Sequence, residues 1–119
     1  MIEPRRQTDI DALVPYFRDR VVLVLRDLVA ASWDPFVIEV LRSEARQTWL
    51  YGIGRTHSLR RRPVTWTHHS LHLVGKAVDI ISAEHGWTSL SFFEALKTAA
   101  WAHGLHVNAT DRCHVEWRD

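Results

Sequence analysis

The segment "THHSLHLVGKAVDI", residues 67–80, is the part of the sequence that decides the fold. Its last letters are rich in β-branched and small apolar residues, which favours a strand over "KAVDII". Side chains alternate between the two faces of a strand, so Val78 points towards a core while Asp79 points the other way. Gly75 allows a sharp turn before this strand, and His72 lies on the loop that leads into it. The segment therefore predicts a strand with a histidine and a carboxylate on its polar side.

The other elements follow from hydrophobic periodicity and from turn residues. Apolar residues recur at three- and four-residue steps over residues 9–31, which indicates an amphipathic helix with Pro15 as a kink or as its true start. We expect a strand over 36–41, a helix capped by Ser43 and ended by Gly52 and Gly54, a long loop over 55–69, a helix over 88–104 and a last strand over 113–118. This order predicts an α+β fold, a small antiparallel sheet with flanking helices.

Length and composition are those of one folded domain. The chain has 119 residues, of which 46% are hydrophobic, and only five glycines and four prolines, so residues 1–119 are expected to form a single domain. Six tryptophans are expected mainly in the core, with Trp66 on the loop as the exception. The single cysteine, Cys113, excludes an internal disulfide and a thiol-ligated structural zinc site. We expect it to be a buried apolar residue on the face opposite His114.

Charge and hydropathy argue against two classes of partner. The formal net charge is +1, too small to give the positive field that nucleic-acid binding needs, although the run "RTHSLRRRP" could attract an anionic polymer locally. The most apolar N-terminal stretch, residues 21–31, contains Arg26 and Asp27 and is too short for a membrane span or a signal-peptide core. We therefore expect no nucleic-acid partner, no membrane insertion and a cytoplasmic location at synthesis.

The last strand offers a polar face like that of the segment quoted first. Alternation places His114 and Glu116 on one face. If the two strands are neighbours, His72, Asp79 and His114 can converge, and two imidazoles with one carboxylate suit a zinc ion that keeps an open fourth position. Asp111 would then lie on the preceding turn, where it could accept a proton from a water that zinc activates.

Simpler interpretations of the same residues exist. His68 and His72 have the i, i+4 spacing of a metal-binding helix, but the segment is not helix-like. Asp79 could pair with Lys76 or an arginine, and Asp111 could cap a turn.

Three separated segments resemble the motifs of a known family. "SLHLVGKAVDI" and "DRCHVEW" resemble the S-x-H-x-x-G-x-A-x-D and D-x-x-H-x-E motifs of zinc peptidases that cut bacterial peptidoglycan. These are the D-alanyl-D-alanine carboxypeptidases and the L-alanyl-D-glutamate endopeptidases of phage lysins. "LRSEARQTWLYGIGRT" resembles a third motif of the family, and the match spans residues 36–117 in the family's order. The resemblance implies a hedgehog/DD-peptidase-like fold.

The resemblance also implies a role for each matching residue. It implies His72, Asp79 and His114 as zinc ligands and Asp111 as the general base. It implies that Arg42 polarises the scissile carbonyl. Ser70 and Gln47 match positions that would support the site, and Glu116 would orient a metal ligand. Arg42 could instead pair with Glu39 or Glu44 on the surface. The family's Gly- and Trp-containing stretch before the catalytic acid is replaced here by "HVNATDRC".

The function that the resemblance implies is a zinc metallopeptidase that hydrolyses an amide bond in peptidoglycan stem peptides. We expect a monomeric, endolysin-like enzyme that acts on the cell wall after release from the cytoplasm. The alternative is a zinc-binding module without catalysis, a structural or cell-wall-binding part of a phage or envelope assembly. Such a module would need the three ligands but neither Asp111 nor Arg42.

Overall fold

The fold is an α+β arrangement around one small sheet, as predicted. The computed structural model describes residues 2–40, 42–65 and 71–118. Their elements are η1 (Ile10–Ala12), α1 (Pro15–Ala30), β1 (Pro35–Glu39), α2 (Glu44–Gly52), η2 (Leu71–Val74), β2 (Ala77–Ser82), α3 (Leu90–Ala102), β3 (His106–Val107) and β4 (His114–Glu116). The strands lie in the order β1-β2-β4-β3, and every neighbouring pair is antiparallel.

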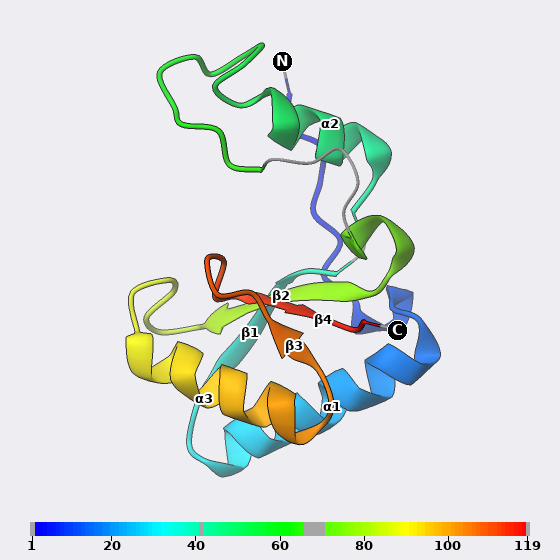
Figure 1. The fold of residues 1–119 in the computed structure, drawn as a ribbon, viewed down its shortest axis with the longest axis vertical. Coiled ribbons are helices and arrows are strands. Elements are labelled where there is room, and N and C mark those ends of the chain that lie inside the picture. The colour runs from blue at the N-terminus through cyan, green and yellow to red at the C-terminus, as the bar shows by residue number, and fades with distance from the viewer. Residues whose placement is uncertain (1, 41, 66–70, 119) are drawn as a thin grey trace.

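The helices lie on two sides of the sheet. Figure 1 shows α1 and α3 packed together on one side, while α2 and the loop that follows it stand on the other side. The hydrophobic core lies between the sheet and the α1/α3 pair, and its fully buried members include Phe17, Val21, Val24, Val78, Ile80, Phe92, Leu96 and Val115. Among the described residues, every helix is too short or too polar to span a lipid bilayer.

Helix boundaries follow the capping signals. α1 begins at Pro15, because the missing N–H of proline costs nothing in the first helical turn. Of the two roles expected for Pro15, a kink or the true start of the helix, the second is confirmed, and the residues before it form the separate 3-10 helix η1. Ser43 caps α2, since its side chain accepts a hydrogen bond from the backbone N–H of Arg46. Ser89 caps α3 in the same way through the N–H of Phe92.

The strands differ from expectation at three points. All six residues of β2 are buried, because His72 of η2, His114 of β4 and Arg42 cover the side that carries Asp79. β3 was not foreseen, since its two residues, His106 and Val107, are too few to show alternation. β4 begins only at His114, so Cys113 lies in the preceding turn, where strand alternation does not apply.

Two of the tryptophans are not core residues. Trp87 is 58% exposed and Trp101 is 70% exposed, so the expectation that they are buried is wrong. Trp33 and Trp117 do pack against the core, partly buried. Trp66, the expected exception, lies outside the described residues.

Gly75, just before β2, packs closely against the backbone of residues 12–14. Its φ is +71°, and a Cβ added there would lie 3.2 Å from the carbonyl oxygen of Ala12 and 3.3 Å from the backbone nitrogen of Val14. Gly104 has a similar φ of +75°, but an added Cβ would meet no atom of the described residues within 4 Å. Gly104→Ala therefore measures the backbone cost alone, about 1–2 kcal/mol. We expect Gly75→Ala to lower the free energy of unfolding by more, as measured by urea denaturation. Equal losses would show that the contact with residues 12–14 is easily relieved.

Candidate metal centre

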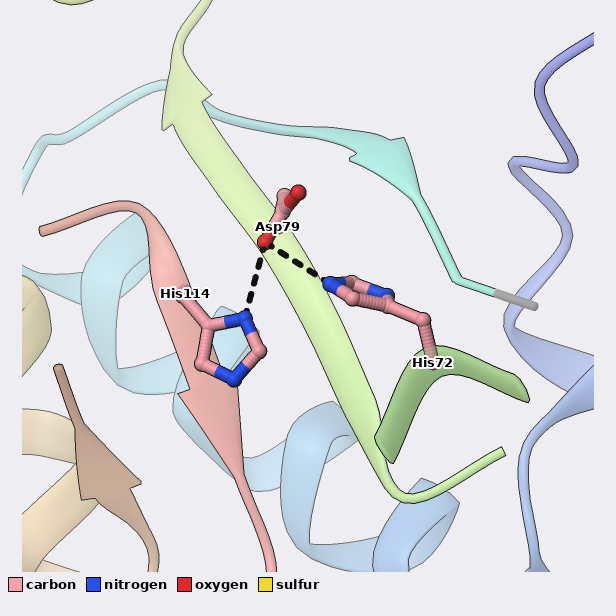
Figure 2. A group of neighbouring side chains, drawn as sticks. All are labelled: His72, Asp79 and His114. Atoms are coloured by element: carbon pink, nitrogen blue, oxygen red, sulfur yellow. Dashed lines mark hydrogen bonds and ion pairs between the residues drawn. The ribbon is translucent and has the colours of Figure 1, made fainter. Parts of the chain in front are cut away.

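Three side chains from three elements meet above the sheet. His72 comes from η2, Asp79 from the middle of β2 and His114 from β4, and Figure 2 shows both rings turned towards one oxygen of the carboxylate. His72 Nε2 lies 3.2 Å and His114 Nδ1 lies 3.4 Å from Asp79 Oδ1. Asp79 and His114 are direct partners in the antiparallel register of β2 and β4. The two strands are thus neighbours, and the fold brings the predicted cluster together.

Each imidazole has a hydrogen-bond acceptor at both of its nitrogens. His72 Nδ1 lies 3.2 Å from the carbonyl oxygen of Val40, and His114 Nε2 lies 2.9 Å from Glu116 Oε1. When these outer nitrogens carry their protons, the inner nitrogens present lone pairs to an ionised carboxylate. Three acceptors then face one point, which is an arrangement that a cation satisfies.

The spacing of the ligand atoms suits zinc. Zn–N and Zn–O bonds of about 2.0–2.2 Å in a tetrahedron place neighbouring ligand atoms about 3.3–3.6 Å apart. The two separations in the cluster are 3.2 and 3.4 Å. Two histidines and one carboxylate also leave a fourth position open, as in catalytic zinc sites. The residues therefore fit a zinc ion that is bound by the chain on three sides.

The protonation of the cluster reflects its internal pairing. Burial opposes ionisation of Asp79, but hydrogen bonds and charge from His114 and His72 outweigh it and hold the pKa of Asp79 well below its usual range. Burial likewise disfavours protonation of His114, but Asp79 and Glu116 outweigh it and raise its pKa. A proton on His114 is therefore bound more tightly than on a free imidazole, and it competes with zinc for the same nitrogen.

The predicted arginine and glutamine lie beside the cluster. Arg42 Nη2 is 3.8 Å from Asp79 Oδ2, and Arg42 Nη1 donates to Gln47 Oε1 at 2.7 Å. Arg42 does pair with Glu39, as the simpler interpretation expected, but this pair is buried and not on the surface. Ser70 lies outside the described residues, as does His68 of the alternative histidine pair.

Asp111 lies at the edge of the cluster on the turn before β4. Asp111 forms a second group with Asp79 and Cys113. One carboxylate oxygen of each aspartate and the Cys113 sulfur all lie within 4.8 Å of one another. The turn is fixed by Asn108, whose Oδ1 accepts from the backbone N–H groups of Thr110 and Asp111. Asp111 is exposed and lines the same cleft as the three ligand candidates.

Cys113 is buried, as expected, but it borders the metal site instead of lying opposite His114. Its thiol donates to Asp111 Oδ1 at 3.3 Å. Burial raises the pKa of this thiol, and the charges of Asp79 and Asp111 raise it further. A thiol held in its protonated form is a poor nucleophile, which agrees with the sequence interpretation.

The cluster lies in a cleft between the sheet and α2. The cleft has a volume of about 810 Å³, and its lining includes Glu39, Arg42, Leu50, Val64, His72, Asp79, Trp87, Asp111 and His114. Its floor is charged, while apolar side chains contribute to its walls. Its volume is within the range of sites that bind small molecules and cofactors.

Comparison with known proteins finds relatives by structure only. No protein-family model and no curated protein matches the chain. The L-Ala D-Glu endopeptidase ChiX of Serratia marcescens superposes with a TM-score of 0.61 at 25% identity, covering 96% of this chain and 90% of that one. A variant of the vancomycin-resistance D,D-pentapeptidase VanY, in complex with Zn(II), has a TM-score of 0.70 at 13% identity, covering 88% and 72%. The L,D-carboxypeptidase DacB of Streptococcus pneumoniae has a TM-score of 0.64 at 18% identity, covering 89% and 66%.

These matches define the class of fold. The chain has the hedgehog/DD-peptidase fold, which it shares with peptidases of peptidoglycan. Within that class it matches an L-alanyl-D-glutamate endopeptidase, D,D-peptidases and L,D-carboxypeptidases over nearly its whole length. The resemblance seen in the sequence is confirmed at this level.

The pairing of His114 with Asp79 predicts a pH dependence for the metal-free protein. His114 binds its proton more tightly in the folded state, so its contribution to stability is complete below its usual pKa of 6.5 and is lost as pH rises through the raised value. We expect the free energy of unfolding, measured by urea denaturation with a chelator present, to fall as pH rises above 6.5. Zinc takes the place of the proton, so stabilisation by added zinc should grow over the same range.

Two variants check the source of this dependence. His114→Gln should remove most of it. His103→Gln should leave it in place, because His103 pairs with Asp27 at 2.7 Å, on helix α1 and away from the metal cluster. A His114→Gln variant that keeps the full dependence would contradict the assignment.

Proposed function

We propose that this chain is a zinc-dependent peptidase that hydrolyses an amide bond in the peptide stems of peptidoglycan. One observation carries the proposal, namely the His72, Asp79 and His114 cluster in the lining of a cleft of about 810 Å³. The fold, shared with peptidoglycan peptidases, supports the choice of substrate.

His72, Asp79 and His114 would hold the zinc ion. When bound, zinc supplies a Lewis acid and lowers the pKa of a water molecule towards neutrality. Hydrogen bonds hold both rings in place, since the Val40 carbonyl accepts from His72 and the Glu116 carboxylate accepts from His114. These bonds leave the other nitrogen of each ring facing the position suited to zinc.

Asp111 would act as the general base. Its carboxylate lies within 4.8 Å of Asp79, at the open side of the cluster, and is exposed to the cleft. It accepts a proton from the attacking water as the new C–O bond forms at the scissile carbonyl. The same proton then passes to the leaving nitrogen as the C–N bond breaks, which returns Asp111 to its ionised form.

Arg42 would stabilise the negative charge that develops on the carbonyl oxygen. Its guanidinium carries a fixed charge and lies next to the zinc ligand Asp79. Hydrogen bonds to Glu39 and Gln47 hold it in place before substrate arrives, so little reorganisation is needed in the transition state.

Among the candidate bonds we favour the one between L-alanine and D-glutamate. ChiX, an L-Ala D-Glu endopeptidase, is 25% identical to this chain and is covered over 90% of its length. The resemblance to phage lysins further suggests a monomer that is made in the cytoplasm and meets the cell wall after release.

Two variants separate metal binding from catalysis. His72→Ala should lose both zinc and activity. Asp111→Asn should keep zinc but lower kcat by about a hundred- to ten-thousandfold, the usual contribution of a general base. Zinc content is measured by atomic spectroscopy and activity on purified cell walls. If Asp111→Asn abolished zinc binding instead, Asp111 would be a ligand and not the base.

Mass spectrometry of digested peptidoglycan tests the function itself. The new amino and carboxyl termini identify the bond that is cut, and we expect a free L-alanine carboxylate and a free D-glutamate amine. Zinc-loaded wild type that releases no fragment from any wall preparation would overturn the enzyme proposal. Such a result, with zinc bound, would favour the zinc-binding module without catalysis.

A further inference from the structure

Glu39 is a buried carboxylate at the floor of the cleft for which the sequence suggested no role in the site. It is 3% exposed and ends strand β1. The register of β1 against β2 shifts between Val37 and Glu39, and this irregularity makes Glu39 the direct partner of Asp79. Such irregularities re-aim side chains near functional sites. Here the shift places two carboxylates beside each other on the face that lines the cleft.

Two buried arginines neutralise this pair of carboxylates. Arg42 donates to Glu39 Oε1 through both Nε, at 3.0 Å, and Nη2. Arg46 donates through Nε to the other oxygen, Oε2. Arg46 is 2% exposed, and its Nη1 reaches Glu3 Oε1 at 3.1 Å. These side chains form a series of ion pairs with alternating charge, which runs from Glu3 through Arg46, Glu39 and Arg42 to the zinc-ligand candidate Asp79.

The contacts of Arg42 leave it little freedom. Its Nε and one Nη2 proton are used by Glu39, and one Nη1 proton is used by Gln47. A guanidinium has five N–H donors in one plane, so fixing two edges of the plane fixes the direction of the remaining donors. The side chain of Arg42 is only 10% exposed, and its Nη2, which donates to Glu39, also lies 3.8 Å from Asp79 Oδ2.

We propose that Glu39 is a positioning residue that holds the guanidinium of Arg42 at the angle needed to bind the scissile carbonyl oxygen. This inference rests on the proposed function, since it assigns Glu39 to the same site. Arg46 has a different role. It lies on α2 and donates to the second carboxylate oxygen of Glu39, and among the described residues no hydrogen bond joins it to Arg42. Loss of Glu39 should therefore affect catalysis, whereas loss of Arg46 should affect mainly stability.

Three variants test the proposal through kinetics. Glu39→Gln keeps the size of the side chain but removes the charge and one acceptor oxygen, so we expect kcat to fall about ten- to a hundredfold, with little change in KM and full zinc content. Arg46→Met keeps the Glu39–Arg42 contact, so we expect a lower urea midpoint but a kcat close to that of the wild type. Glu94→Gln, at an exposed position of α3 beyond its first turn, is the matched surface control, and neither property should change. Equal loss of kcat in Glu39→Gln and Arg46→Met would reduce Glu39 to a structural residue.

A spectroscopic measurement tests the same geometry without any substrate. An Arg Nε–H bonded to a buried carboxylate exchanges slowly with water, so ¹H–¹⁵N spectra of the wild type should contain slowly exchanging signals from Arg42 and Arg46. Arg42→Lys and Arg46→Met assign them by loss of one signal each. In Glu39→Gln the Arg42 signal should exchange rapidly. An Arg42 signal that stays slow in Glu39→Gln would overturn the positioning role, even if the wild type proved to have no peptidase activity.

Discussion

A carboxylate inside a buried strand is the constraint on which this structure depends. Asp79 lies in the middle of β2, where all six residues are buried, and a buried charge must be compensated by partners. The partners come from three places that are distant in sequence: His72 before the strand, His114 across from it and Arg42 after β1. The positions of η2, of β4 and of the segment between β1 and α2 are thus tied to one side chain.

The sequence predicted the parts of the fold and site that depend on local rules. Pro15 and Ser43 mark helix starts because capping chemistry acts within a few residues. The alternation around Asp79 indicated that it faces away from the core, and the spacing of His114 and Glu116 placed them on one face, where the structure shows them hydrogen-bonded. Those inferences needed only the period of a strand and the assumption that two strands are neighbours.

The features that the sequence did not predict depend on contacts between distant segments. From the sequence alone, Glu39 and Arg46 would be expected on the surface, as most charged residues are. Their burial is possible only because each is paired with a residue of opposite charge. The register shift in β1 leaves no mark in composition. Cys113 was placed on the wrong side because it precedes β4 instead of belonging to it, and a one-residue error in a strand boundary reverses the face of a side chain.

The two oxygens of Asp79 face different groups, and this sets a fixed spacing in the cleft. Oδ1 faces the two imidazoles, while Oδ2 faces the guanidinium of Arg42. One carboxylate group therefore sets the distance between the position suited to zinc and the guanidinium of Arg42. Because β2 is paired with a strand on each side, the Asp79 carboxylate that separates these two positions is itself fixed in the sheet.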